Sequence, residues 1–248
     1  AMGDTFYKLC ALYLLKMHSS QISSFFAGEE DRPVVQLCLQ ALGGSESGVH
    51  ALSAALYNGD GNILLSDDLP NAFNDRNRAK ILAMLADHPQ FKKLFKFVWF
   101  AYGSSSSLLF KHQGKIMETL LSENGVRQGC PIALFLFCLS VHPAFKLANS
   151  VPGVTAVAIA DDLEFVGKPN SVFAAYDKVV AKQEELGINR VSDKRYVLWP
   201  HNETPPESLR KQCRDRGIRL SAGGWDPKSS PGPSRRWVGG FEVALGIP

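Results

Sequence analysis

Cysteine is scarce in this sequence of 248 residues and forms no recognisable framework. The five cysteines are odd in number and widely spaced, and no two of them form a CxxC pair: Cys10, Cys38, Cys130, Cys138 and Cys213. Zinc modules and disulfide-rich secreted folds both depend on paired or closely spaced cysteines. The pattern therefore argues against both, and we expect reduced side chains in the core or in loops.

Long apolar runs and a strong charge excess are also missing. No stretch of about eighteen consecutive apolar residues occurs, so the sequence gives no support for membrane insertion or secretion, and we expect an intracellular protein. The net charge is +3 and the pI about 8.6, well below the excess that identifies a nucleic-acid-binding protein by charge alone. The charge permits a nucleic-acid partner without requiring one.

What is present is the composition and patterning of a globular chain that alternates helices with strands. Apolar residues make up 45% of the chain and charged residues 21%, and the length suffices for one full core. Helical periodicity predicts a first helix with a buried face over residues 6–17, then helices that carry Leu52 and Leu82, and further helices over 91–102, 131–145 and 171–186. Ser45 is the expected N-cap of the second helix, and Asn74 or Asp75 that of the third.

Short apolar or β-branched runs predict the strands. They cover residues 63–68, 108–110, 115–121, 154–159, 163–166 and 195–199, several of them bounded by turn clusters. Residues 200–236 are rich in Pro, Gly, Ser and charge and are expected to be loop. The interleaved elements indicate an α+β or α/β layer fold.

Three carboxylates stand where strands are expected to end. Asp68 follows one buried strand, and Asp161 and Asp162 form the tip of a predicted hairpin. Hard Mg²⁺ ions prefer oxygen ligands and typically use one or two carboxylates together with substrate phosphates. Adjacent strand positions point to opposite faces, so both hairpin acids can reach a metal only if the turn bends, and Asp161 is the safer ligand. Taken alone, an Asp-Asp pair is also ordinary turn chemistry.

Three segments in order carry a family resemblance. They are residues 68–74 (DLPNAFN), 125–131 (GVRQGCP) and 160–162 (ADD). They resemble motifs A, B and C of the reverse transcriptases of non-LTR retrotransposons, nearest to the R2-like and the trypanosomatid spliced-leader-inserted elements. Residues 36–50 are similar to the segment that precedes motif A in that group. Residues 186–189 with Lys194 resemble motif D, and 245–248 resemble the start of motif E, the primer grip.

The resemblance implies an α+β polymerase palm, a ferredoxin-like antiparallel sheet backed by helices. Residues 1–57 would form a partial helical fingers region, 58–199 the palm with motifs A to D, 200–236 a loop-rich segment and 237–248 the start of the primer grip. Fingers strands would lie upstream of Phe6 and a thumb beyond Pro248, so we expect the chain alone to bind nucleic acid weakly. The expected location is nuclear.

The resemblance also implies site residues. Asp68, Asp161 and Asp162 would hold two Mg²⁺ ions, for which Mn²⁺ can substitute, and Lys194 would be the general acid for the pyrophosphate leaving group. A second set would contact substrate and nucleic acid: Phe73 as the steric gate against a ribose 2′-hydroxyl, Gln128, Gly129 and Arg127 at the incoming dNTP, and Asn71 and Arg78 on the RNA template or DNA primer.

Two positions depart from the family pattern. Ile159 replaces the usual Tyr or Phe before ADD, and Pro70 replaces a residue that is commonly Lys. The leading hypothesis is an RNA-directed DNA polymerase palm that extends a primer with dNTPs. The alternative is a catalytically weak or inactive domesticated module that binds a protein or RNA partner. A generic two-metal nuclease has no support in the order of the motifs.

Overall fold

The computed structural model describes residues 5–27, 36–39, 43–188 and 194–222, which form two compact units interleaved in sequence. The first unit comprises Ala1–Ile22 and Asn71–Val141, and the second comprises Ser23–Pro70 and His142–Pro248. In the first unit, Tyr7 of the first helix stacks on Phe97, with ring centroids 5.1 Å apart.

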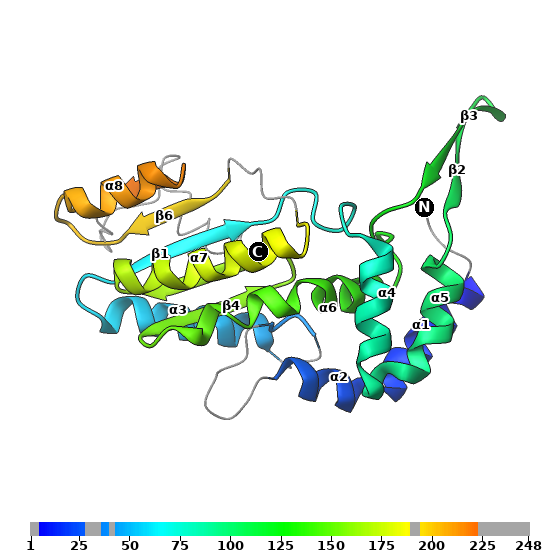
Figure 1. Cartoon of the computed structure of the whole chain (residues 1–248), viewed down its shortest axis with the longest axis horizontal. Coiled ribbons are helices and arrows are strands. Elements are labelled where there is room, and N and C mark those ends of the chain that lie inside the picture. Colours follow the sequence, from blue (N-terminus) through cyan, green and yellow to red (C-terminus); the bar gives the residue numbers. More distant parts are fainter. Residues whose placement is uncertain (1–4, 28–35, 40–42, 189–193, 223–248) are drawn as a thin grey trace. The chain divides into compact units, whose positions relative to one another are not determined.

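The second unit contains a five-stranded sheet (Figure 1). Its strands are β1 (Ile63–Asp68), β4 (Val154–Ile159), β5 (Asp162–Gly167), β6 (Tyr196–Trp199) and β7 (Arg219–Ala222), in the order β4-β5-β1-β6-β7. All neighbours are antiparallel except β6 and β7. The mostly antiparallel, helix-backed sheet confirms the predicted α+β palm-like fold.

Two helices cover opposite faces of this sheet. Helix α3 (Gly44–Asn58) packs Leu52 and Leu56 against Leu64, Val166 and Leu198. Neighbouring strand positions point to opposite faces, so Phe165 faces away from that cluster. On that other face it meets Tyr176 of α7 (Pro169–Glu185), with ring centroids 6.1 Å apart. A short 3₁₀ turn, η2 (Ala148–Ser150), precedes β4.

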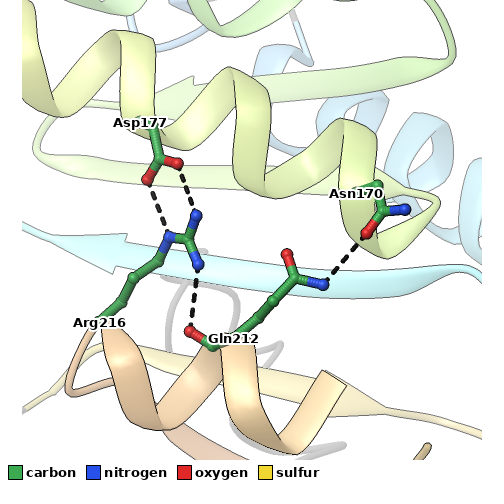
Figure 2. Close-up of polar contacts among 4 residues, drawn as sticks. All are labelled: Asn170, Asp177, Gln212 and Arg216. Atoms are coloured by element: carbon green, nitrogen blue, oxygen red, sulfur yellow. Dashed lines mark hydrogen bonds and ion pairs between the residues drawn. The ribbon is translucent and has the colours of Figure 1, made fainter. Parts of the chain in front are cut away.

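Part of the segment that the sequence predicted as loop is regular structure. Residues 207–215 form α8 (Glu207–Asp215), which leads into β7. Arg216, just beyond α8, binds both carboxylate oxygens of Asp177 on α7 at 2.9 and 2.6 Å, and Gln212 donates to Asn170 at 3.1 Å (Figure 2). The prediction failed because α8 buries only Leu209 and Cys213, too few apolar positions to show a period. Residues 223–248, including the predicted motif E, lie outside the described residues.

The first unit is built from helices and one hairpin. Its elements are α1 (Thr5–Met17), the start of α2 (Ser19–Phe26), α4 (Arg78–Asp87), η1 (Pro89–Phe91), α5 (Lys92–Tyr102), β2 (Ser106–His112), β3 (Lys115–Ser122) and most of α6 (Ala133–Phe145). These elements include the helices and strands predicted for this part of the chain, and α2 and η1 are additions that the sequence did not predict. Strands β2 and β3 pair with each other as a two-stranded antiparallel sheet.

Two local predictions were wrong. The apolar face of α1 was expected to be buried, but Phe6, Leu9 and Tyr13 are 74%, 59% and 64% exposed. The expected helix caps also differ. Gly43 in a left-handed conformation precedes α3, and the side chain of Asn77 accepts from the Lys80 amide at the start of α4. Periodicity finds a helix but does not show what covers it.

One apolar stretch is long enough to cross a membrane by length and composition alone. It runs over Ala133–Ser150 and includes α6. More than half of it, 56%, is buried inside the protein. This burial is the pattern of a core helix.

Candidate metal centre

The sheet register of the second unit places two of the predicted acids face to face. Asp68, the last residue of β1, pairs with Asp162, the first residue of β5. Directly paired residues of antiparallel strands project from the same face, with Cβ atoms about 5 Å apart. The register therefore brings Asp68 and Asp162 together as motifs A and C predict.

Asp161 reaches this end of the sheet from the β4–β5 loop. Ile159 pairs with Asp162, so the loop between them consists of Ala160 and Asp161. Because Asp161 stands outside both strands, the alternation that would separate it from Asp162 does not apply. Ala160 has a φ of 55°, a left-handed conformation that costs a non-glycine residue about 1 to 2 kcal/mol. Residues in such strained conformations persist when surrounding contacts hold them, and they cluster at functional sites.

The carboxylates raise one another's proton affinity. Burial, followed by repulsion from Asp161 and Asp68, raises the pKa of Asp162 to about 7. Burial also raises the pKa of Asp161 and Asp68 adds to this, whereas a backbone hydrogen bond at Asp161 and the charge of Lys194 oppose it. A bound cation would remove this repulsion, so the electrostatics favour a positive ion.

Lys194 lies beside the same acids. Its Nζ is 3.5 Å from Asp68 Oδ2, and its side chain is 73% exposed. Lys194 stands two residues before Tyr196, the first residue of β6, which pairs with Ser66 of β1. The structure therefore brings Asp68, Asp161, Asp162 and Lys194 together in one unit.

Glu164 is an acid of this face that sequence reasoning missed. It lies two residues after Asp162 on β5, is buried, and accepts a hydrogen bond from Ser66 Oγ at 2.9 Å. Burial raises the pKa of Glu164 to about 8 against the opposing effect of the Ser66 bond. The sequence contained a signal for it, because Glu164 is a charged residue inside the apolar run 163–166. Side chains two positions apart on a strand point to the same face, so Glu164 shares the face of Asp162.

The donor chemistry fits a hard divalent ion, although the protein supplies no complete cage. Carboxylate oxygens are the ligands that Mg²⁺ prefers, and it usually keeps waters and substrate phosphates in its shell. Across the described ranges, no three His, Cys, Asp or Glu side chains converge closely enough to hold a metal by themselves. Asp68, Asp161 and Asp162 therefore fit a metal whose shell is completed by substrate.

The motif A loop and motif B meet in the first unit. Phe73 stacks on Phe137 with centroids 4.7 Å apart, and its carbonyl accepts from the Val126 amide at 2.7 Å. Gly125 has a φ of 74°, and a Cβ there would lie 2.4 Å from Asn74 O, so only glycine fits. The predicted gate and the start of motif B are therefore one packed structure.

Gln128 and Gly129 form an exposed turn before α6. Both are exposed, and Gly129 has a φ of 80° with no atom within 4 Å of a Cβ placed there. Asn71 is likewise exposed, with a φ of 49°, and its Oδ1 accepts from Asn74. These three residues are exposed, and their predicted contacts with dNTP and nucleic acid stay predictions.

Two arginines that the resemblance placed at nucleic acid and at the incoming dNTP make hydrogen bonds inside the protein. Arg78 is buried, and it donates to Gly125 O at 2.8 Å and to the carbonyl and hydroxyl of Ser122 at 2.6 and 2.8 Å. Arg127 donates to Ala101 O at 2.7 Å and lies over the Tyr102 ring. The prediction that Arg78 contacts nucleic acid is wrong, because its guanidinium is buried and donates to carbonyl and hydroxyl groups of Ser122 and Gly125. Arg127 remains partly exposed.

Arg76 is a second residue of interest that the sequence did not single out. It is only 3% exposed, and its Nε and Nη2 have no hydrogen-bond partner among the described residues. Desolvation by burial lowers the pKa of Arg76. A buried, unsatisfied guanidinium is energetically costly. No sequence pattern could have shown it, because Arg76 precedes α4 among ordinary turn residues.

The chain was compared with known proteins by sequence and by fold. No family model matches the chain. Over 146 residues, 58% of this chain, it is 27% identical to the retrotransposable element SLACS 132 kDa protein of Trypanosoma brucei gambiense. The fold is similar to telomerase from Candida albicans in complex with a fragment of telomeric RNA, with a TM-score of 0.52, and to apo telomerase from Candida tropicalis, with a TM-score of 0.50. The chain is therefore similar in sequence to part of a retrotransposon protein and similar in fold to telomerases.

The chain corresponds to a limited part of each of these relatives. It spans 12% of the trypanosome protein. The similarity to the telomerases covers 78% and 75% of this chain but 34% and 39% of theirs, at 12% and 10% identity. Similarity at that identity shows the fold alone, so the function must be argued from this domain's own residues.

Proposed function

We propose that this domain catalyses RNA-directed DNA synthesis by adding deoxynucleotides to a primer on an RNA template. The observation that carries the proposal is the register of β1 and β5. It sets Asp68 opposite Asp162, with Asp161 in the adjoining loop, inside a reverse-transcriptase-like fold.

Asp68 and Asp161 are the proposed principal metal ligands, with Asp162 beside them. When bound, two Mg²⁺ ions would activate the primer hydroxyl and neutralise the charge on the transferred phosphates. Asp162 must lose its proton to take part, since its pKa lies at about 7. The three carboxylates orient the reacting groups and contribute no covalent chemistry.

Lys194 is the proposed general acid. Its ammonium group is 3.5 Å from Asp68 and largely exposed, so it can reach a leaving group bound beside the acids. Transfer of a proton from Nζ to the departing pyrophosphate would stabilise the charge that develops there. In the absence of substrate, the ion pair with Asp68 holds the Lys194 side chain near the acids.

Residues of the first unit support deoxynucleotides as the proposed substrate class. The Phe73 ring, stacked on Phe137, is the proposed barrier to a ribose 2′-hydroxyl, so dNTPs would be preferred over rNTPs. The exposed Gln128-Gly129 turn would contact the incoming nucleotide. The Candida albicans telomerase was solved with RNA, which supports RNA as the partner class here. A nuclear location would suit DNA synthesis from such a template.

Primer extension tests the proposal. The chain is supplied with an RNA template, a DNA primer, dNTPs and Mg²⁺ or Mn²⁺, and is compared with Asp161→Asn and with Asp60→Asn, an exposed aspartate of the same unit. We expect Asp161→Asn to slow extension on the order of a thousandfold, because the ions supply several kcal/mol of charge stabilisation. Asp60→Asn should match the unaltered chain. Absence of extension by the unaltered chain would contradict the proposal.

A second candidate is a binding module that retains the fold without the chemistry. The observation that favours it is the exposed apolar surface of α1 and the β2–β3 hairpin, because large exposed patches mark interaction sites. The side chains concerned are at least 46% exposed: Phe6, Leu9, Tyr13, Leu108, Leu109, Phe110, Ile116 and Leu120. Equal behaviour of the unaltered chain and Asp161→Asn in the extension assay would favour this candidate.

A further inference from the structure

A short segment before α3 lies along the free edge of the sheet in the second unit. Gln36 forms a parallel bridge with Ala158 of β4, and the Leu37 amide donates to Ala158 O at 2.8 Å. Leu37 also packs against the core cluster under α3. A Cβ on Gly48 of α3 would lie only 2.8 Å from Leu37, so glycine makes room for this side chain. The segment is therefore anchored by its backbone and by its leucine.

The side chain of Gln36 extends from this anchored backbone to the tip of the β4–β5 hairpin. Its Nε2 donates to Ala160 O at 3.0 Å, and its Oε1 accepts from the Ala160 amide at 2.9 Å. Both polar groups of the Ala160 backbone are thus bound by one side chain. Gln36 is only 3% exposed, so the two bonds are shielded from water.

Ala160 is the residue of the loop that most needs such support. It has the left-handed φ of 55°, whereas two-residue hairpin loops usually place glycine, asparagine or aspartate in such conformations. Without the two bonds, the peptides on either side of Ala160 could rotate toward an unstrained conformation. Asp161 follows directly, so its carboxylate would move with them.

We propose that Gln36 is a positioning residue that holds the Ala160 backbone and thereby fixes the carboxylates of Asp161 and Asp162 for metal-dependent nucleotidyl transfer. The catalytic consequence rests on the proposed function. The conformational consequence does not, because it concerns hydrogen bonds within this chain. A displacement of a reacting group by about 1 Å can slow an enzyme about a hundredfold.

Two variants of the full chain separate this role from packing. Gln36→Met keeps a similar volume and removes both bonds to Ala160. Cys38→Ala is the matched control, because Cys38 Sγ donates to Gln36 Oε1 at 2.9 Å and its loss leaves both Ala160 bonds in place. Amide hydrogen exchange and amide NMR shifts of residues 160–162 report the loop without metal or substrate. Single-turnover primer extension at varied dNTP concentration reports the chemistry.

In Gln36→Met we expect the Ala160 amide to exchange at least about tenfold faster and the amide signals of Asp161 and Asp162 to shift, with Cys38→Ala unchanged. The extension rate constant should fall about tenfold to a hundredfold, with the KM for dNTP changed less than about threefold. Unchanged exchange and shifts would overturn the inference, as would altered exchange with an unchanged extension rate. If the unaltered chain extends no primer, the proposed function fails, and exchange and shifts alone decide whether Gln36 holds the loop.

Discussion

Asp68 and Asp162 lie directly opposite each other on the antiparallel strands β1 and β5, with Ser66 and Glu164 as the next pair on the same face. The first pair lies at the end of the sheet and the second pair is buried behind it. These two neighbouring pairs place three acids, Asp68, Asp162 and Glu164, on one face of the sheet. Burial raises the pKa values of Asp162 and Glu164. This arrangement is costly for folding unless protons or cations offset it.

The first prediction concerns the pH dependence of stability. The pKa of Glu164 is about 8 in the folded chain against an ordinary value of 4.5, so the folded state binds the proton more tightly than the unfolded state does. The free energy of unfolding contributed by this group should therefore be fully present below pH 4.5 and be lost as pH rises to about 8. Glu164→Gln should flatten that decline.

Urea unfolding between pH 5 and 8.5 measures this effect. The control is Glu184→Gln, which alters an exposed glutamate at the end of α7 and should keep the decline of the unaltered chain. An equal pH dependence in Glu164→Gln and the unaltered chain would show that Glu164 is ionised at neutral pH in the fold.

The second prediction contrasts two buried arginines of the first unit. Arg78→Met should cost about 3 kcal/mol, because it leaves the carbonyls of Ser122 and Gly125 without their donor. Arg76→Met should cost less than about 1 kcal/mol or even stabilise the chain, because Nε and Nη2 of Arg76 have no described hydrogen-bond partner to lose. Chemical unfolding of both variants measures the difference. A larger loss in Arg76→Met would reveal a partner of that guanidinium.

The third prediction concerns the choice of sugar. Phe73→Val should lower the preference for dNTPs over rNTPs, measured as the ratio of kcat/KM values, by about tenfold or more, since it opens space for the 2′-hydroxyl. Phe95→Val is the control, because Phe95 is a half-buried aromatic residue of the same unit that also stacks on another ring. An unchanged preference in Phe73→Val would remove Phe73 from sugar selection.

The sequence predicted the strands around the site because they are short apolar runs with clear limits. Residues 63–68 and the two runs that flank Ala160 and Asp161 all form strands. The pairing and register of the strands depend on contacts between distant parts of the chain. A single sequence does not show these contacts. The motif resemblance therefore predicted that Asp68 and Asp162 meet, and their direct pairing is seen only in the sheet.

Other features were missed for distinct physical reasons. Helix α8 buries only Leu209 and Cys213, so few apolar residues mark it in the sequence, and its polar contacts with α7 through Gln212 and the following Arg216 depend on the fold. The role of Gln36 depends on a side chain that spans from one segment to the backbone of another far along the chain. The burial of Arg78 reverses the ordinary expectation for an arginine near a nucleic-acid site, because its partners come from the distant loop at Ser122 and Gly125.

The most direct test of a metal centre at Asp68, Asp161 and Asp162 is a Mn²⁺ titration followed by the electron paramagnetic resonance signal of the free ion. It is run at pH 8, where Asp162 is mainly ionised given its pKa of about 7. The geometry predicts that the unaltered chain and Asp60→Asn bind Mn²⁺ alike and that Asp161→Asn binds at least about tenfold more weakly. Equal Mn²⁺ affinity in Asp161→Asn and the unaltered chain would contradict a metal centre at these residues.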